Sequence, residues 1–421
     1  MFALADCNNF FVSCERVFRP DLEGKAVVVL SNNDGCAISR SNEAKRLGIT
    51  MGEPFYQFAE MERAGRVTVF SSNFALYGDM SRRVQSVLRS AAPEIEVYSI
   101  DESFLNLNGM EAVDFDGWAK ELSKECRRQT GIPVSVGVAP TKTLAKIASK
   151  LCKSYPKLRG GCYLYRTEDI EKVLRNFPIE DIWGIGRRYS KRLKTYGLHT
   201  AYDFYCQSEE WVRREMGITG VNTLRELHGK ASIDFAPSEE PKKQICVSRS
   251  FAKEIFDIQG LSEQVSMYSS MACEKLRRQH SVCHSATVFI FTNRHKENLP
   301  QQFEAREVKF PIATDSTIEI NREVLDTLRS MFRNGMGYKK AGVVLSGIGR
   351  RDEVQQSLFD KVDRSKHNAL MQTIDRLNQR AHTTVVGMAS RSMTGFVMNR
   401  NHLSPAYTTS WNDILLVKTD I

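Results

Sequence analysis

The sequence predicts an α+β protein composed of several domains. Its 421 residues are enough for about three domains of ordinary size. The first part of the chain alternates short apolar runs with helical patterns, and a later part shows strands and helices in the order β-α-β-β-α-β. Hydrophobic residues make up 42% and charged residues 26% of the chain, which is the composition of a globular protein with a substantial core.

Three short apolar runs predict buried strands in the first part of the chain. They cover residues 2–5, 26–30 and 134–138. Between them, apolar side chains recur at helical spacing from residue 76 to residue 88, and Pro93 ends this helix. These elements predict a first domain with an antiparallel or mixed sheet.

A basic helical region and a proline-containing linker separate this domain from the β-α-β-β-α-β unit. The helical region spans residues 168–230, and the stretch 236–241 holds two prolines and little apolar content. From about residue 350 the chain is polar and weakly periodic, so we expect an appended tail there. The predicted elements of the unit are strands at 245–251, 286–292, 303–310 and 341–346 and helices at 261–276 and 320–331.

The charge of the chain is unevenly distributed. The net charge is +9, from 59 basic and 50 acidic side chains. Residues 141–230 hold 18 Lys and Arg against 10 Asp and Glu, an excess of +8, whereas residues 1–140 hold 15 against 19, a net of −4. This asymmetry indicates that chemistry and polyanion binding are divided between regions, although a solvated basic surface without a partner would have the same pattern.

The sequence also excludes several classes of protein. No stretch resembles a transmembrane segment, and the N-terminus does not resemble a secretory signal because Asp6 interrupts its apolar run. Ten cysteines are scattered singly, without close pairs at zinc spacing. We therefore expect a reduced, intracellular protein with no structural zinc and no membrane association.

Three carboxylates are the strongest candidates for chemistry. Asp6 follows three apolar residues at the end of the first predicted strand, and Asp101 and Glu102 are adjacent in a strand-like segment. Adjacent residues on a flat strand point to opposite faces, so both can reach one site only at a turn or bulge. Burying neighbouring anions is costly without cations, and Mg²⁺ suits hard oxygen ligands. Two metal ions held this way would serve phosphoryl transfer, whereas the alternative is an Asp-Glu pair that caps an exposed hairpin turn.

A predicted helix carries four lysines on one face. Lys142, Lys146, Lys150 and Lys153 are spaced i, i+4, i+8 and i+11, and apolar residues occupy the opposite face. Such a stripe of ammonium groups can hold a triphosphate or a nucleic acid backbone. The alternative is an ordinary amphipathic helix with a solvated face.

A glycine-containing turn in the basic region predicts a phosphate-binding hairpin. Gly184, Ile185 and Gly186 lie between two helical patterns, and five cations follow within eight residues, beginning with Arg187. Glycines let backbone amides approach a phosphate closely. The pattern is typical of a helix-hairpin-helix, which binds the DNA backbone without reading its sequence.

Together these motifs resemble the Y-family of lesion-bypass DNA polymerases over nearly the whole chain. Within that family the sequence is most similar to the UmuC type, which comprises the catalytic subunit of bacterial DNA polymerase V and its plasmid-borne relatives. The combination of Tyr-Ser-Ile-Asp-Glu with the lysine helix is highly specific. The blocks that carry the resemblance are residues 31–36, 71–74, 98–102, 136–146 and 403–409.

The resemblance implies a right-hand polymerase fold with a helix-hairpin-helix thumb and a β-α-β-β-α-β little finger. The palm would be interrupted by a fingers insertion, and the C-terminal tail would hold a clamp-binding peptide and a UmuC-type extension. The implied boundaries are palm 1–10 and 75–165, fingers 11–74, thumb 166–235, little finger 242–350 and C-terminal tail 351–421.

The resemblance also implies roles for particular residues. It implies two Mg²⁺ ions held by the catalytic carboxylates Asp6, Asp101 and Glu102, with the backbone carbonyl of Cys7 as a further ligand. Phe11 matches the aromatic steric gate that excludes a ribose 2′-OH, and a simple core aromatic is the alternative. The implied nucleotide-binding residues are Phe10, Phe11, Ser39, Asn42, Lys45 and Lys153, and the implied DNA-binding residues are Gly184, Ile185, Gly186, Arg187, Lys191 and Arg249.

Three of these positions depart from the family pattern. UmuC-type chains often have Tyr where Phe11 stands, and many family members have Tyr at the position of Asn42 and Arg at that of Lys45. A lysine is a point charge and not a bidentate fork, so the phosphate geometry would be less fixed. No implied metal ligand is lost, so the implied activity stands.

The resemblance further implies binding partners. Gln355, Leu358 and Phe359 resemble the short peptide by which bacterial polymerases dock on the sliding clamp, with a glutamine hydrogen bond and two apolar anchors. The other implied partners are primer-template DNA, dNTPs, a processed UmuD-type dimer and the RecA filament. The implied setting is the cytoplasm during the SOS response.

The implied reaction is error-prone translesion synthesis. The primer 3′-OH attacks the α-phosphate of a dNTP with the help of two metal ions. The implied polymerase domains account for the length of the chain, so no proofreading exonuclease is expected. Two alternatives share some of these features. A nucleotide cyclase also uses paired carboxylates but needs no DNA-binding hairpin, whereas a non-enzymatic scaffold at stalled forks needs no carboxylate cluster.

Overall fold

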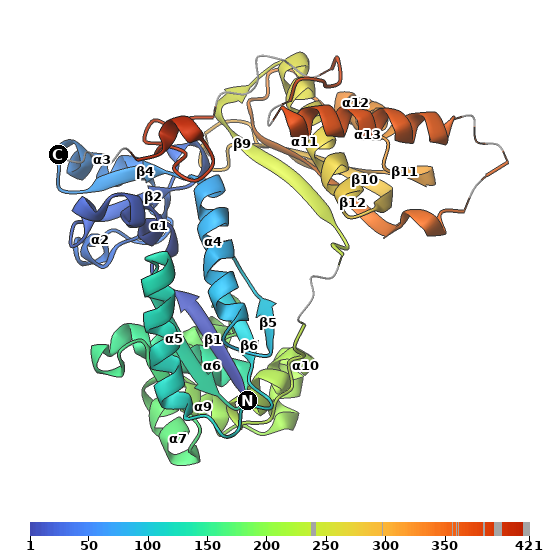
Figure 1. The fold of residues 1–421 in the computed structure, drawn as a ribbon. Coiled ribbons are helices and arrows are strands. Elements are labelled where there is room, and N and C mark those ends of the chain that lie inside the picture. The colour runs from blue at the N-terminus through green and yellow to red at the C-terminus, as the bar shows by residue number, and fades with distance from the viewer. Residues whose placement is uncertain are drawn as a thin grey trace. The chain divides into compact units, whose positions relative to one another are not determined.

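The chain folds as two units in the computed structural model (Figure 1). Unit 1 comprises Met1–Glu239 together with Arg400–Ile421, and unit 2 comprises Glu240–Asn399. Residues 237–240 of the predicted linker at 236–241 lie outside the described residues. No helix in the described part of the chain is long and apolar enough to cross a membrane. The structure describes residues 1–236, 241–296, 298–355, 357–358, 360, 362–381, 384–390 and 398–415.

A five-stranded sheet of order β5-β6-β1-β7-β8 forms the palm of unit 1. Neighbouring strands are antiparallel except for the parallel pair β7–β8, so the sheet is mixed. Side chains alternate along β1, so that Ala3 and Ala5 pack with α4 and α5 while Leu4 packs with α6. These elements are β1 (Phe2–Cys7), β5 (Glu94–Val97), β6 (Glu102–Asn106), β7 (Val134–Ala139), β8 (Gly161–Tyr163), α4 (Phe74–Arg89), α5 (Phe115–Thr130) and α6 (Lys142–Ser154).

A three-stranded sheet of order β3-β2-β4 lies between α1 and α4 in the chain and forms the fingers. Strand β2 is antiparallel to β3 and parallel to β4. Leu403 of the C-terminal segment forms a parallel bridge with Ser71, so this segment lies along the open edge of β4. These elements are α1 (Phe10–Phe18), β2 (Val27–Leu30), β3 (Ala37–Arg40), α2 (Asn42–Arg46), α3 (Phe55–Arg63) and β4 (Thr68–Ser71).

Four helices form the basic thumb region predicted from the sequence. Their apolar side chains share one core with α6, so this region is anchored to the palm. Gly217, with a φ of 71°, interrupts the last helix. The four helices are α7 (Thr167–Asn176), α8 (Arg187–Thr195), α9 (Ala201–Tyr205) and α10 (Glu209–Leu227).

Unit 2 has the predicted β-α-β-β-α-β order of a little finger. Its antiparallel sheet has the strand order β11-β10-β12-β9, and the two helices contribute to one core with it. The β-branched and aromatic runs of the sequence became strands longer than expected, because antiparallel pairing extends them beyond their apolar parts. The elements are β9 (Ile245–Ile255), α11 (Ile258–Arg278), β10 (Ser281–Thr292), β11 (Phe303–Thr314), α12 (Thr317–Met331) and β12 (Tyr338–Arg350).

The region after residue 350 is more structured than the polar tail predicted from the sequence. It contains α13 (Arg364–Arg380), whose one buried residue is Met371. An ion pair of 2.7 Å between Arg277 and Asp375 joins α13 to α11. A helix that buries so little apolar surface leaves almost no periodicity in the sequence, which is why it was not predicted.

Candidate active site

The carboxylates Asp6 and Glu102 are opposite each other on neighbouring strands. Strands β1 and β6 are antiparallel, and Asp6 is the register partner of Glu102. Residues two apart on a strand share a face, so Asp6 lies on the side of Leu4. By the same rule Glu102 lies on the side of Phe104. Leu4 and Phe104 both belong to the core that α6 covers, so the two carboxylates lie on the α6 side of the sheet.

A tight turn brings Asp101 to the same end of the sheet. The N–H groups of Tyr98 and Ser99 both donate to the Glu102 carbonyl, at 3.1 and 3.0 Å. The Cys7 N–H donates to the Asp101 carbonyl at 2.9 Å, and the Ser99 hydroxyl donates to Oδ1 of Asp101 at 2.5 Å. The turn predicted for the Asp-Glu pair is therefore confirmed, and it is a hairpin connection tied to the end of β1.

All four lysines of the predicted stripe are paired with carboxylates. Helix α6 packs against β1 and β7, which turns its lysines toward acidic side chains of the palm and the thumb. Lys142 is 1% exposed and Lys146 is 19% exposed, whereas Lys150 and Lys153 are 46% and 37% exposed, so only the second half of this lysine face is solvated. The pairs are Lys142–Glu96 at 2.5 Å, Lys146–Glu102 at 2.8 Å, Lys150–Asp181 at 2.6 Å and Lys153–Asp6 at 2.5 Å.

The three carboxylates are close enough to affect one another. Burial raises the pKa of the Asp6 carboxyl to about 6, and the Lys153 ammonium opposes this rise. The negative charges of Glu102 and Asp101 raise the same pKa further. Within the described residues, no three His, Cys, Asp or Glu side chains are gathered so that they would hold a metal ion. Lys146 and Lys153 instead provide the positive charge beside Glu102 and Asp6.

The donor chemistry at this sheet end suits a hard divalent cation. Carboxylate oxygens are the ligands that Mg²⁺ prefers, and the two lysine ammonium groups show that the carboxylates accept positive charge here. A bound cation would favour the ionised form of Asp6 and so reverse the effect of burial on its pKa. The residue types present therefore fit a divalent cation, and Asp6 and Glu102 would have to exchange their lysine partners to bind it.

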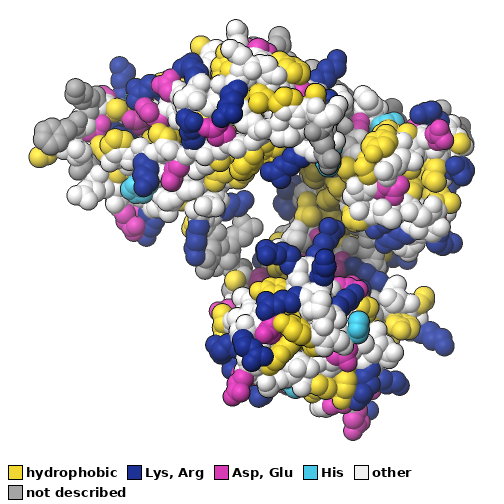
Figure 2. Space-filling model, turned by 180° about the vertical axis from the view of Figure 1, so that it is seen from behind, with side chains coloured by type: hydrophobic (Ala, Val, Ile, Leu, Met, Phe, Trp, Pro, Cys, Tyr) yellow, Lys and Arg dark blue, Asp and Glu magenta, His cyan; other side chains and the backbone are white. Residues whose placement is uncertain are grey.

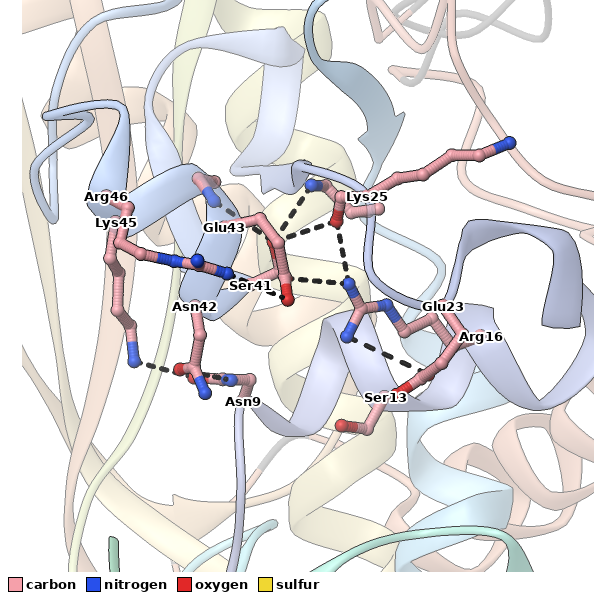
Figure 3. A network of polar contacts seen from close by, with 12 residues as sticks. Asn9, Ser13, Arg16, Glu23, Lys25, Ser41, Asn42, Glu43, Lys45 and Arg46 are labelled. Carbon is pink, nitrogen blue, oxygen red and sulfur yellow. Dashed lines mark hydrogen bonds and ion pairs between the residues drawn. The ribbon is translucent and has the colours of Figure 1, made fainter. Parts of the chain in front are cut away.

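Side chains of α2 reach the start of α1 through Asn9 (Figure 3). Asn9 lies in the left-handed region, with φ 47° and ψ 46°, directly before α1. Its Oδ1 accepts a hydrogen bond from Nζ of Lys45 at 2.7 Å, and its Nδ2 donates to Oδ1 of Asn42 at 3.1 Å. Burial lowers the pKa of Lys45, and the positive charges of Arg40 and Lys153 lower it further. Lys45 and Lys153 come from different helices, and the effect of Lys153 on the pKa of Lys45 shows that they are close enough to interact.

Phe10 and Phe11 begin α1 and differ in exposure. Phe10 is buried, whereas Phe11 is half-buried. The Phe11 ring stacks on Tyr77, with a centroid separation of 4.4 Å and an interplanar angle of 14°, and it meets Phe74 edge-on at 6.0 Å. Ser39 is buried, and its hydroxyl accepts a hydrogen bond from a backbone N–H of α1 at 3.4 Å. Phe11 thus has both a rigid support and an accessible part of its ring.

The predicted hairpin connects the short turn after Ile179–Asp181 to α8. Gly184 has a φ of 95°, and a Cβ at Gly186 would meet nothing within 4 Å. Ile185 is buried between them, and Arg187 is exposed on the first turn of α8. Lys191 is exposed as well, and Figure 2 shows Lys and Arg side chains over the lower part of unit 1, which holds the thumb. Two other cations of α8 are paired, as Arg192–Glu215 and Lys194–Glu180.

The remaining predicted contacts lie in unit 2. Arg249 is half-buried on β9 and lies close to Tyr268 of α11. Burial raises the pKa of Tyr268 to about 12, and the positive charge of Arg249 opposes this rise. It therefore lies on the face of this sheet that α11 covers. Gln355 is exposed and Leu358 is fully exposed, whereas Phe359 lies outside the described residues. The roles of these four residues stay predictions.

Sequence reasoning missed two residues of this site and underused a third. Asn9 follows a strand and precedes a helix, and asparagine is enriched in the left-handed region, so its position was a usable signal. Arg40 had no such signal, because its proximity to Lys45 depends on the fold of the fingers. Lys146 was recognised as part of the stripe, but its pairing with Glu102 was not.

Comparison with known proteins matches four regions of the chain. Residues 5–150 match the impB/mucB/samB family, and residues 242–358 match the C-terminal domain of that family. Residues 167–198 match the HHH motif of the IMS family, which covers α7 and α8. Residues 368–417 match a domain of unknown function.

Individual relatives align with nearly the whole chain. Protein ImpB of Salmonella typhimurium is 38% identical over 99% of this chain and 100% of its own length. Protein UmuC of Salmonella typhimurium strain LT2 is also 38% identical, with the same coverage. Among solved structures, a Y-family DNA polymerase chimera of Dbh and Dpo4 has a TM-score of 0.67 at 24% identity and covers 83% of this chain and 100% of its own. The chain therefore belongs to the impB/mucB/samB family, as a UmuC-type member of the Y-family of DNA polymerases.

Proposed function

We propose that this polymerase carries out error-prone translesion synthesis by two-metal nucleotidyl transfer from a dNTP to a primer 3′-OH. The observation that carries the proposal is that Asp6, Asp101 and Glu102 lie at one end of the palm sheet, where Lys153 pairs with Asp6 and Lys45 lies near Lys153. Nucleotidyl transfer needs this combination, because carboxylates hold the metal ions while ammonium groups hold the triphosphate.

In this proposal the three carboxylates and the Cys7 carbonyl hold two Mg²⁺ ions. When bound, these ions neutralise charge that develops on the α-phosphate and lower the pKa of the attacking hydroxyl. Before that, Lys146 and Lys153 hold the partly buried carboxylates of Glu102 and Asp6 in position through ion pairs. The protein therefore prepares the site electrostatically before substrate arrives.

Other residues position the substrates. Lys45 and Lys153 bind the triphosphate as point charges from two sides. The accessible part of the Phe11 ring lies against the sugar and excludes a 2′-OH, supported by its stacking partner. In the thumb, the open approach at Gly186 and the exposed Arg187 bind the DNA backbone without reading sequence.

The proposal extends to fidelity and partners. The matched regions account for polymerase modules over most of the chain, so we expect no proofreading, low fidelity and low processivity. Processivity would come from the sliding clamp through the exposed Gln355 and Leu358. A processed UmuD-type dimer and the RecA filament would be the other partners, in the cytoplasm during the SOS response.

Primer extension by the full chain with Mg²⁺ and dNTPs tests this proposal, on intact and on abasic templates. The reactions include and omit the clamp, the UmuD-type dimer and RecA. Asp101→Asn should abolish extension and leave DNA binding, measured by fluorescence anisotropy, nearly unchanged. Asp114→Asn is a matched control, because Asp114 caps the start of α5 and takes no part in the site.

Each outcome has a definite meaning. Full extension by Asp101→Asn would contradict the assignment of the carboxylates. Turnover of a nucleotide to a cyclic product without template would favour a nucleotide cyclase. Tight DNA binding with no extension, even with all partners present, would favour a non-enzymatic scaffold.

A further inference from the structure

The C-terminal segment 401–415, here called the strap, is bonded to the fingers and to the start of α4. The Ser71 N–H donates to the His402 carbonyl at 2.9 Å, and the His402 N–H donates to the Ser71 hydroxyl at 3.0 Å. Leu403 bridges Ser71 in parallel, and the Asn401 N–H donates to Oδ2 of Asp34 at 2.8 Å. Figure 1 shows this part of the chain, in red, beside β4. The strap thus extends the edge of the fingers sheet.

One side chain of the strap enters the interior of unit 1. Ser404 is 5% exposed, and its hydroxyl donates to Oε1 of Glu15 at 3.1 Å. The same hydroxyl accepts a hydrogen bond from Nδ2 of Asn73 at 3.1 Å. Ser404 therefore joins α1 and the start of α4 through a single buried oxygen.

The contact continues to the proposed steric gate. Oε1 of Glu15 also accepts a hydrogen bond from the Tyr77 hydroxyl at 2.7 Å, and both Glu15 and Tyr77 are fully buried. The Tyr77 ring is the one on which Phe11 stacks. A chain of contacts therefore runs from Ser404 through Glu15 and Tyr77 to Phe11. We call these four residues the gate network.

The buried carboxylate in this network depends on its donors. Burial raises the pKa of Glu15 to about 7, and the hydrogen bonds from Tyr77 and Ser404 lower it. Oε2 of Glu15 has no hydrogen-bond partner among the described residues. Because the carboxylate accepts hydrogen bonds from the hydroxyls of Tyr77 and Ser404, loss of either donor leaves a buried polar group less well satisfied.

The strap is also fixed beyond Ser404. Tyr407 stacks on Phe18 at the end of α1, with a centroid separation of 4.6 Å and an interplanar angle of 6°. Helix α1 is therefore held by the strap at Glu15 and again one turn later, and Phe11 is on the first turn of the same helix. The strap thus acts on the helix that carries the gate as well as on the ring behind it.

We propose that the strap is a positioning element of the nucleotide site, in which Ser404 acts through Glu15 and Tyr77 to fix the Phe11 ring and so sets the discrimination against ribonucleotides. This inference rests on the proposed role of Phe11 as the steric gate. Ser404 does not touch the nucleotide in this scheme. Its effect is on the freedom of the ring that does.

The test is single-nucleotide insertion of a dNTP and of the matching rNTP by the full chain with its partners. In Ser404→Ala, kcat/KM for the rNTP relative to the dNTP should rise by roughly three- to tenfold, within what the loss of one hydrogen bond to a buried charged group allows. The dNTP parameters should stay near those of the original chain. Ser404→Thr, which keeps the hydroxyl, should restore most of the discrimination. Thr409→Ala removes an exposed hydroxyl of the strap outside the gate network and should change nothing.

Two further variants separate the possible failures. Tyr77→Phe keeps the ring but removes its bond to Glu15, so it should relax discrimination in the same direction, and it decides the question if Ser404→Ala does not fold. Phe11→Ala tests the gate itself. If Phe11→Ala leaves discrimination unchanged, the gate assignment is wrong. If Phe11→Ala relaxes it but Ser404→Ala and Tyr77→Phe do not, or if these two lower dNTP and rNTP insertion equally, the positioning role of the strap is wrong.

Discussion

The Nζ atom of Lys153 lies 2.5 Å from Oδ2 of Asp6. A lysine proposed to bind the triphosphate is thus paired with a carboxylate proposed to bind metal. Lys146 and Glu102 form an equivalent pair on the next strand, at 2.8 Å. Both pairs place an ammonium group beside a partly buried carboxylate, and both must exchange partners when metal and nucleotide bind.

Replacing Lys153 should separate these two roles. Lys153→Met is expected to raise the KM for dNTP about tenfold or more, as loss of a charged hydrogen bond implies. In the nucleotide-free protein the same change should strengthen Mn²⁺ binding, because no ammonium competes for Asp6. Steady-state insertion and Mn²⁺ titration by electron paramagnetic resonance measure the two effects. Lys150→Met, on the same helix but paired with Asp181, is the control, and an unchanged KM in Lys153→Met would refute the triphosphate role.

Lys142 should matter for stability instead of catalysis. Its ammonium is buried and bonded to Glu96 and to the Asp234 carbonyl, each at 2.5 Å. Lys142→Met leaves a largely buried carboxylate without its cation and should lower the free energy of unfolding by about 2–4 kcal/mol. Urea denaturation measures this loss. The double variant Lys142→Met with Glu96→Gln should recover part of this loss of stability. Primer extension per folded molecule should be unaffected in the single and the double variant. Additive losses of stability would show that Lys142 and Glu96 are not coupled.

The two glycines of the hairpin should respond differently to alanine. Gly184 has a φ of 95°, and an added Cβ would lie 2.8 Å from Oγ1 of Thr223, so Gly184→Ala should cost about 1–2 kcal/mol of stability. Gly186→Ala should leave stability unchanged, because its backbone is extended and its Cβ meets nothing. It should nevertheless weaken DNA binding, since the Cβ occupies the approach to the backbone. Thermal denaturation and fluorescence anisotropy distinguish the two, and full DNA affinity in Gly186→Ala would argue against phosphate contact there.

The burial of Glu15 predicts a pH dependence of folding stability. Its pKa rises from an ordinary 4.5 to about 7 in the folded chain, so between these values the folded state binds more protons than the unfolded state. Stability from this group is therefore fully present below pH 4.5 and is lost as pH rises through 7, by at most about 3 kcal/mol. Glu15→Gln should gain stability relative to the original chain at pH 8 and lose that advantage at pH 5. Urea midpoints measure it, with the exposed Glu60→Gln as control, and a pH-independent difference would contradict the buried charge.

Much of the site was predictable because its signals are local. An acidic residue at the end of an apolar strand marks Asp6, and an Asp-Glu pair inside a strand-like run requires the turn that the structure has. The glycines of the hairpin and the strand order of unit 2 are local in the same sense. These features need no knowledge of distant parts of the chain.

The features that sequence reasoning missed depend on distant contacts. The lysines of α6 look like a solvated stripe until the packing of the helix on β1 brings Lys153 to Asp6. The bond between Asn73 and Ser404 joins residues 331 positions apart, so no pattern of spacing reveals it. Helix α13 was missed for a different reason, since it buries one apolar residue and leaves little periodicity.

The amide of Asn73 serves two segments at once. Its Oδ1 accepts the N–H of Leu76 and caps the start of α4, while its Nδ2 donates to Ser404 and to the Pro405 carbonyl. Detachment of the strap by a partner protein would leave the Asn73 side chain free to rotate, which would weaken an α4 N-cap worth about 1 kcal/mol. Faster hydrogen exchange at Leu76 would then report, inside the palm, on an event at the C-terminus of the chain.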